Sequence, residues 1–414
     1  MSQQATIQAS VASTRPFWTY WAASATSATG TAVTAVALPL VAVLTLHASA
    51  VEMGVLAASS YVAWLVVGLP AGALVARLPL RGTQVACDAA RAVAVVSVPV
   101  VWWWGTLTLA HLVAVALVVS FADVFFFVAN TTFLPSVVSR ESLQARNSLM
   151  SGTHAATQLG GPSLGGLLVQ VLGAAPALLA DAVSYVVSAV LLRTLPDREV
   201  PPPQETATLR EQVREGWRFT AHHPVIGPCM WDATATNLVC GAQMALFPLY
   251  LVRVVGAPPG VVGVLLACEG VGSLLGAAAC VRLVRAVGSA RACLLGSLVS
   301  LLAGLLLPLG TGGMAYACFA AGTAVFAAGV VVVSTTTRTY RQTATPPHLL
   351  SRVMATVRFV SWGAIPVGGL AAGLLAEWVG ARDALLVAGV TFVLAPAVLV
   401  ASPIRRMRDF PERP

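Results

Sequence analysis

Several ionisable side chains lie inside long apolar runs of this sequence, where a charge is costly and therefore informative. Among them are three carboxylic acids, Asp123, Asp232 and Glu269, and the imidazole of His154. A carboxyl group that is withdrawn from water holds its proton more tightly, so it can bind and release a proton near neutral pH. We therefore predict that Asp123, Glu269 and Asp232 are candidates for reversible protonation.

Each of these residues also has a structural interpretation. Asp123 could form an ion pair with an arginine such as Arg77 or Arg91, and a lone histidine such as His154 more often packs through a hydrogen bond. Asp181, early in its apolar run, is expected to cap a helix or to pair near the outer surface. The polar residues that we expect to line a cavity are His154, Asn237 and Gln243.

The composition indicates the surroundings of these side chains. Of 414 residues, 57% are hydrophobic and 10% are charged, whereas soluble domains carry about 25% charged residues. Because 57% of 414 is about 236 residues, and twelve membrane helices of about 20 residues need about 240, the composition fits a helical membrane protein. The sequence lacks the short alternating segments of a membrane β-barrel. We predict an all-α integral membrane protein with twelve transmembrane helices in two six-helix bundles.

The apolar segments fall into two groups of six, separated by a polar stretch. The first group lies near 17–45, 52–77, 84–104, 107–136, 143–172 and 175–195, and the second near 226–254, 259–284, 288–309, 312–340, 350–378 and 382–402. The polar stretch includes a sequence at 209–219 that is apolar on one face and charged on the other. We predict an N-terminal bundle over 1–195, a cytoplasmic linker with an amphipathic helix over 196–225, and a C-terminal bundle with a short basic cytoplasmic tail over 226–414.

The basic residues indicate how the chain crosses the membrane. The sequence has no lysine, so all 24 basic residues are arginine, and nearly all of them follow the even-numbered segments or lie near the termini. Arginine-rich loops stay in the cytoplasm. We therefore predict a multi-pass protein of the cell (inner, cytoplasmic) membrane with both termini in the cytoplasm. This placement accounts for the net charge of +8 without a nucleic-acid partner.

The sequence lacks motifs that several classes of function require. Without lysine it can form neither a Walker A phosphate loop nor a lysine Schiff base. It has no HExxH or GxGD motif, and its seven cysteines form no CxxC pair and have no histidine spacing suited to zinc. We therefore expect no enzymatic activity, metal or cofactor, and no ATPase subunit.

The two halves of the chain resemble each other. Gly173-Ala-Ala-Pro-Ala-Leu-Leu before the sixth segment matches Gly380-Ala-Arg-Asp-Ala-Leu-Leu before the twelfth, and the two glycines are 207 positions apart (380 less 173), which is half of 414. Leu143-Gln-Ala-Arg146 and Leu349-Leu-Ser-Arg352 recur at nearly the same offset. Duplication of a six-helix unit accounts for both matches.

A short, glycine-led basic turn joins the second and third segments. It runs from Gly72 through Arg77 to Arg81, and Asp88 and Arg91 follow in the third segment. Short charged turns can hold two helices in one relative orientation through hydrogen bonds to helix ends. We predict that these five residues form a conformational latch. The alternative is that the arginines only fix the topology and that Asp88 pairs with Arg91 three residues later.

The fifth segment carries a Gly-Pro-x-x-Gly-Gly pattern formed by Gly161, Pro162, Gly165 and Gly166. Proline removes one backbone hydrogen bond from a helix, and glycines allow a neighbouring helix to approach closely. The pattern therefore predicts a kinked and tightly packed helix.

These motifs resemble those of the major facilitator superfamily (MFS), whose loop between the second and third helices reads roughly G-x-L-x-D-R-x-x-R-R. Gly72, Arg77 and Arg81 take the corresponding places, whereas Ala76 stands where that pattern has its acidic residue. The glycine-proline pattern of the fifth segment is similar to one found in exporters of this superfamily. With the sequence from Asp123 to Asn147, the chain resembles the branch that contains enterobactin and macrolide efflux proteins.

The resemblance implies a secondary active transporter that exports a small organic molecule, such as a drug, an antibiotic or a siderophore-like metabolite. Export would proceed by alternating access in exchange for protons, with the proton gradient as the energy source. The cargo and the lipid bilayer are the implied partners, and we expect a monomer. Two alternatives stay open: an importer of a small nutrient, and a non-transporting membrane sensor of the same fold, which Phe127 favours because it replaces an acidic residue that this branch often has.

Overall fold

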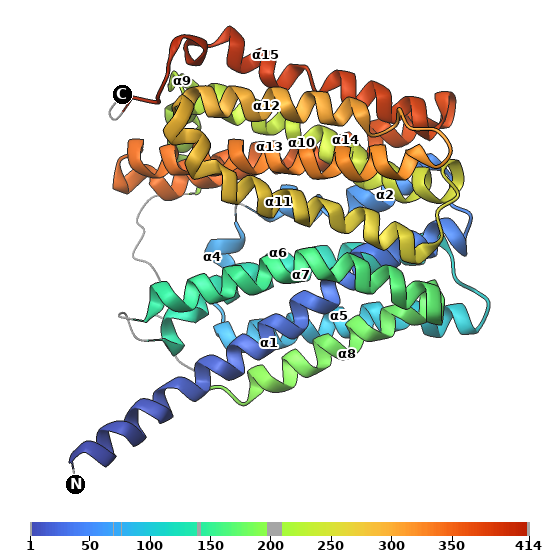
Figure 1. Cartoon of the computed structure of the whole chain (residues 1–414). Coiled ribbons are helices and arrows are strands. Elements are labelled where there is room, and N and C mark those ends of the chain that lie inside the picture. Colours follow the sequence, from blue (N-terminus) through green and yellow to red (C-terminus); the bar gives the residue numbers. More distant parts are fainter. Residues whose placement is uncertain (1, 69, 76, 139–141, 197–208, 412–414) are drawn as a thin grey trace. The chain divides into compact units, whose positions relative to one another are not determined.

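The computed structural model of the chain describes residues 2–68, 70–75, 77–138, 142–196 and 209–411 (Figure 1). Within these ranges every regular element is a helix, which confirms the all-α class. The α-helices are α1 (Ser2–Leu44), α2 (Ala50–Ser59), α3 (Val62–Val66), α4 (Ala71–Val75), α5 (Leu80–Trp103), α6 (Leu109–Val137), α7 (Leu143–Leu172), α8 (Ala174–Arg193), α9 (Leu209–His222), α10 (Ile226–Leu249), α11 (Pro259–Val287), α12 (Ser289–Leu306), α13 (Met314–Ala344), α14 (Pro347–Thr391) and α15 (Leu394–Ala401). A π-helical turn (Tyr250–Val254) continues α10, and a 3₁₀ turn (Pro403–Arg406) follows α15.

Most of the predicted apolar segments are single helices. Nine stretches of the described chain are long and apolar enough to cross a membrane, and one of them, Leu349–Ala401, contains both the eleventh and the twelfth predicted segments. The fifth predicted segment is α7, which runs from Leu143 to Leu172. Apolar runs of about 20 residues favour helices in lipid because only internal hydrogen bonding satisfies the backbone there.

The second apolar segment is divided, where one continuous helix was expected. Its described residues form α2, α3 and α4 in succession. Ser49 starts α2 with a capping box, in which its hydroxyl accepts from the Glu52 N–H (3.3 Å) and its own N–H donates to the Glu52 carboxylate (2.7 Å). Pro70, between α3 and α4, has no N–H to donate, so a regular helix is interrupted there.

The helices gather into two compact units. Unit 1 takes in 1–46 and 66–205, and unit 2 takes in 47–65 and 206–414. The limit between the units therefore falls within the second apolar segment, so that α2 and all but the last residue of α3 belong to unit 2 although they precede most of unit 1 in the sequence. Part of the expected linker, 197–208, lies outside the described residues, and the predicted domain limits at 195 and 226 stay predictions.

In unit 1, α1 packs on α7 and α8, and α5 packs on α6 and α8. Phe17, Tyr20 and Phe133 belong to its apolar core. The rings of Tyr20 and Phe133 are 5.7 Å apart, and the Tyr20 hydroxyl donates to the Asn130 side chain. These contacts hold α1 against α6.

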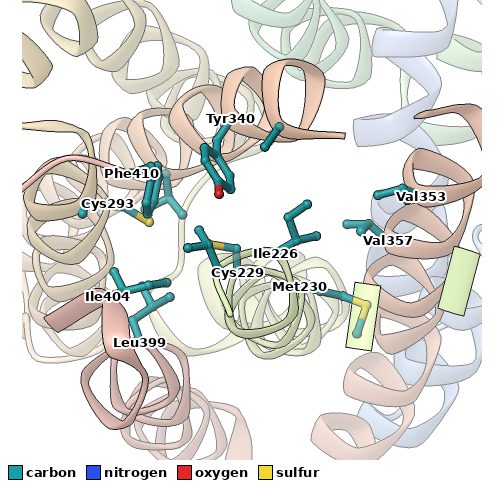
Figure 2. Packing of buried hydrophobic residues seen from close by; sticks show 14 of the residues in the cluster. Ile226, Cys229, Met230, Cys293, Tyr340, Val353, Val357, Leu399, Ile404 and Phe410 are labelled. Atoms are coloured by element: carbon teal, nitrogen blue, oxygen red, sulfur yellow. The ribbon is translucent and has the colours of Figure 1, made fainter. Parts of the chain in front are cut away.

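In unit 2, α10 and α2 pack on α14, α9 packs on α14, and α13 packs on both α11 and α12. Figure 2 shows part of the apolar core, where Cys229 of α10, Cys293 of α12 and Tyr340 of α13 converge. The ring of Phe410, near the end of the chain, lies 4.9 Å from the Tyr340 ring. The tail that was predicted from its basic residues is thus fastened to unit 2 through this aromatic contact.

The two glycines of the predicted repeat have the same backbone conformation. Gly173, between α7 and α8, has φ 91° and ψ 161°, and Gly380, within the long α14, has φ 84° and ψ 160°. Only glycine adopts such positive φ values without strain. Each glycine bends the chain between two apolar helices, as the internal repeat predicts.

Candidate functional site

A polar stripe runs along α8 in the interior of unit 1. Asp181, Ser184, Tyr185 and Ser188 are all buried, and their spacing places them on one face of the helix. Because α1 and α5 are the main neighbours of α8, this stripe lies between two other apolar helices. Buried polar groups are costly inside a membrane bundle, so the stripe indicates a functional rather than a packing role.

Arg91 of α5 is the centre of the site. Its guanidinium lies 3.3 Å from the Asp88 carboxylate on the same helix and 3.1 Å from the Asp123 carboxylate on α6. It also donates to the carbonyl oxygen of Ala122 at 3.0 Å. The sequence left open whether Asp123 pairs with an arginine such as Arg91 and whether Asp88 pairs with Arg91. The structure contains both ion pairs.

Aromatic rings enclose the guanidinium. The carbon at its centre lies 4.4 Å from the centroid of the Phe126 ring and 5.3 Å from that of the Tyr185 ring, at distances where a cation is attracted to a π face. The Tyr185 hydroxyl is hydrogen-bonded to the Thr31 hydroxyl of α1 at 3.0 Å. The site therefore connects α5, α6, α8 and α1 through one cation.

The exposed fractions distinguish the two acids. The Asp88 side chain is fully buried and that of Arg91 is 3% exposed, whereas 36% of the Asp123 side chain is exposed at the surface of unit 1. Asp123 is therefore the more accessible of the two acids. A proton on Asp123 would neutralise its carboxylate and break its ion pair with Arg91, which would change the charge balance in the interior.

Asp181 lies deeper than the sequence indicated. It is fully buried within unit 1, and the N-cap of α8 is Gly173, so Asp181 does not cap this helix, whereas its position relative to the outer surface stays a prediction. Its Oδ1 accepts a hydrogen bond from the Ser184 hydroxyl at 3.0 Å. Sequence reasoning missed the stripe of Asp181, Ser184, Tyr185 and Ser188, although their one-face spacing on an otherwise apolar helix was a usable signal.

The five residues of the predicted latch lie in different settings, and the latch itself stays a prediction. Gly72 lies in α4, the Arg77 side chain is exposed, and Arg81 donates to the carbonyl oxygen of Leu195 at 2.6 Å, which ties the start of α5 to the chain beyond α8. Asp88 and Arg91 belong to the buried site instead. Ala76, where the family pattern has an acid, lies outside the described residues.

The glycine-proline pattern of the fifth segment packs against α1. A Cβ placed on Gly165 would lie 3.0 Å from the carbonyl oxygen of Val33, and one placed on Gly161 would collide with the side chain of Ala32. Gly166 is buried, and Pro162 lies inside α7. The predicted close helix contact is therefore present in unit 1.

The candidates in unit 2 lie on two helices, α10 and α11. Asp232 of α10 is buried and accepts a hydrogen bond from the Ser297 hydroxyl of α12 at 2.8 Å. Glu269 of α11 has an exposed side chain. Of the predicted cavity residues, Gln243 is buried and Asn237 half-buried on α10, whereas His154, on α7 of unit 1, is exposed.

A second cation is held by aromatic rings in unit 2, and the sequence did not single it out. The guanidinium carbon of Arg358 on α14 lies 4.2 Å from the Trp64 ring centroid and 4.3 Å from the Trp362 ring centroid. Because Trp64 lies in α3, this contact joins α3 to α14. Among the described residues no group of three or more histidine, cysteine or acidic side chains is placed to hold a metal ion.

Long apolar helices that enclose a charged pair are typical of multi-pass membrane proteins, and the chain has both features. The chain belongs to the transmembrane secretion effector family, whose model matches residues 9–413. Its sequence is 27% identical over 399 residues to the multidrug efflux pump Tap of Mycolicibacterium fortuitum, covering 92% of this chain and 93% of that protein. It is 26% identical over 394 residues to the MFS-type transporter YfiS of Bacillus subtilis, covering 90% and 91%.

Solved structures share the fold. The nucleoside transporter NupG superposes with a TM-score of 0.75 at 13% identity, covering 93% of this chain and 98% of that one. A bacterial homologue of the iron transporter ferroportin, in an inward-facing state, gives a TM-score of 0.71 at 15% identity, covering 92% and 99%. The chain thus has the fold of the major facilitator superfamily, as its motifs predicted.

Proposed function

We propose that this membrane transporter exports a small organic molecule across the cell membrane in exchange for protons, by alternating access, with both termini in the cytoplasm. The observation that carries the proposal is the ion pair between Arg91 and Asp123, because one partner is buried and the other is partly exposed. An acid in that position can take a proton and pass the change in charge to the interior.

The direction and the cargo class are supported by similarity. A multidrug efflux pump is among the relatives that match most of the chain, and Gly161 and Gly165 form the close α7–α1 contact expected of the exporter pattern. The arginines that follow the even-numbered segments support the cytoplasmic termini. Drug-like lipophilic molecules, antibiotics and siderophores are therefore the cargo classes to test.

The experiment uses the full chain, purified and reconstituted in liposomes with a pH-sensitive dye inside. A pH gradient is imposed, and proton flux is followed while a panel of lipophilic drugs, antibiotics and siderophores is added one at a time. We expect one cargo class to trigger proton flux in the wild type and Asp123→Asn to abolish it. Asp383→Asn, which removes an exposed acid of α14, is the matched control and should keep the flux.

Three results would contradict parts of the proposal. Undiminished flux in Asp123→Asn would exclude this residue from proton coupling. Cargo and protons moving in the same direction would indicate import. Cargo binding without any movement of cargo, by a protein shown to be folded, would favour a sensor.

A further inference from the structure

Asp181 occupies a space that α1 leaves open for it. Gly30 of α1 faces it so closely that a Cβ at this position would collide with the Asp181 carboxylate and with the Ser184 hydroxyl. Any other residue at position 30 would displace the carboxyl group. Unit 1 is therefore built around a fully buried acid.

The hydrogen bonding of this acid is incomplete. Ser184 donates to Oδ1, whereas Oδ2 is buried and receives no hydrogen bond of ordinary geometry within the described chain, although the Thr34 hydroxyl of α1 lies close to the carboxyl group. A buried carboxylate with an unsatisfied oxygen is costly, and protonation removes most of that cost because the neutral carboxyl group is far less strongly hydrated. The geometry thus favours a neutral, protonated Asp181.

The charged and titratable groups that act on Asp181 come from three helices. α5 supplies Arg91, α6 supplies Asp123, and α8 itself supplies Tyr185 one turn away, while α1 contributes neutral Gly30 and Thr34. Arg91 is ion-paired with Asp88 and Asp123, and no ion pair to Asp181 is present within the described chain. Three acids therefore share one guanidinium, and ionisation of all three would leave two uncompensated negative charges inside unit 1.

We propose that Asp181 is a second proton-binding site of this transporter, which holds a proton while Asp123 is paired with Arg91 and releases it when Asp123 becomes protonated. In this exchange the proton neutralises the Asp123 carboxylate, so Asp123 no longer needs Arg91 as its counter-ion. The guanidinium, which already lies against the Tyr185 ring on the same helix as Asp181, then compensates the ionised Asp181. One O–H bond forms at Asp123 with a proton from one side of the membrane, and one breaks at Asp181, whose proton leaves to water on the opposite side, so protons and charge balance.

The inference rests on the proposed proton-coupled function, and its first test is independent of transport. The infrared carbonyl band of protonated carboxyl groups is recorded on the purified full chain across a pH series. We expect the Asp181→Asn variant to lose part of this band at neutral pH, and the exposed-acid control Asp383→Asn to keep it. An unchanged band in a folded Asp181→Asn protein would overturn the proposal.

The coupling to Arg91 is tested with two more variants. In Asp123→Asn the guanidinium is free to compensate Asp181, so the Asp181 contribution should disappear at lower pH than in the wild type. In Ser184→Ala, which keeps the acid and therefore avoids the risk that Asp181→Asn misfolds, loss of the donor to Oδ1 should make the band persist to higher pH. If neither variant changed the pH at which the Asp181 band disappears, the inference that Asp181 shares the Arg91 guanidinium with Asp88 and Asp123 would be contradicted.

A transport measurement then tests whether Asp181 releases and rebinds its proton in each transport cycle or stays protonated throughout. With a cargo that triggers flux in liposomes, the ratio of protons to cargo is compared between the wild type and Asp181→Asn, and we expect the variant to lose one proton per cargo. An unchanged ratio would show that Asp181 stays protonated throughout and would overturn the exchange. Absence of flux in the wild type would contradict the proposed function instead, while the infrared result on Asp181 would still stand.

Discussion

Gly54 of α2 lies directly against Gly369 of α14 within unit 2. A Cβ on Gly54 would be 2.7 Å from the carbonyl oxygen of Gly369, and a Cβ on Gly373, one turn later, would be 2.6 Å from the carbonyl oxygen of Ala50. Small residues let the backbones of two membrane helices come into contact. In lipid, where the hydrophobic effect does not drive helices together, this close van der Waals packing stabilises their association. This contact explains why α2 belongs to unit 2.

We predict that Gly54→Leu destabilises unit 2 by about 1–3 kcal/mol, because the new side chain meets a backbone carbonyl that cannot move aside. The measurement is thermal unfolding of the purified protein in detergent. Gly152→Ala is the matched control, since a Cβ at Gly152 of α7 meets nothing within 4 Å. The control should unfold at the same temperature as the wild type or above it. Equal destabilisation by both variants would contradict the close α2–α14 contact.

Replacement of Arg91 should be among the most destabilising changes in unit 1. Arg91→Met removes the partner of Asp88 and Asp123 and leaves the buried Asp88 and the partly exposed Asp123 without a cation, for which we expect a loss of about 3–5 kcal/mol in denaturant unfolding. The triple variant with Asp88→Asn and Asp123→Asn should recover most of that loss, because neutral buried groups need no cation.

Arg77→Met serves as the control for Arg91→Met, since the Arg77 side chain is exposed. Its effect should stay within about 0.5 kcal/mol. If the triple variant were no more stable than Arg91→Met alone, the loss would come from packing around the Phe126 and Tyr185 rings and not from charge.

The sequence predicted the helices well and the depth of polar residues poorly. Long apolar runs determine helices in lipid whatever their neighbours are, so α5, α6 and α8 fall close to their predicted limits. The division of the second segment was not predicted, because its hydropathy is continuous and its first part, α2, packs on α14 through glycines far away in sequence. Hydropathy contains no information on such contacts.

The same reason explains the mixed outcome for the site. The ion-pairing of Asp123 with Arg91 was an available alternative, because both residues stand out as charges in apolar segments. The burial of Asp181 depends on Gly30, 151 positions earlier, which leaves room for the carboxyl group. A single sequence shows that Asp181 is an acid on an apolar helix. Whether its face of the helix is buried depends on the position of α1, which the sequence does not give.

His223 makes the stability of unit 2 depend on pH. Its Nδ1 accepts hydrogen bonds from the N–H groups of Val225 and Ile226, each at 3.2 Å, at the start of α10, so the ring must be neutral at that nitrogen. Burial lowers the pKa of His223 below its usual 6.5. The unfolded chain therefore takes up a proton at higher pH than the folded chain does.

The contribution of His223 to stability is fully present above about pH 6.5 and is lost as the pH falls below that value toward the lowered pKa. We expect the unfolding temperature of the wild type to fall more steeply between neutral pH and about pH 5 than that of His223→Asn, which keeps an acceptor but does not titrate. His222→Gln, at an exposed position next to it, should retain the wild-type dependence. Parallel curves for the wild type and His223→Asn would exclude His223 as the titrating group.

Ser297 and Asp232 should act as a coupled pair in unit 2. The Ser297 hydroxyl donates to Oδ1 of Asp232 at 2.8 Å, and Oδ2 has no hydrogen-bond partner within the described chain, so Ser297→Ala leaves a buried acid without its donor. We expect a loss of about 1–3 kcal/mol, measured by denaturant unfolding. Ser334→Ala is the control, because its hydroxyl bonds only to a carbonyl oxygen of its own helix.

A double-mutant cycle distinguishes this hydrogen bond from simple packing. Once Asp232 is replaced by leucine, a serine at 297 has no acceptor there, so Ser297→Ala should cost much less than it does beside the acid, with a coupling free energy of about 0.5–3 kcal/mol. Strictly additive effects would show that the two residues are independent. A coupled pair would also mean that protonation of Asp232 is felt at α12, which is the physical requirement for the role in proton coupling that the sequence predicts for this residue.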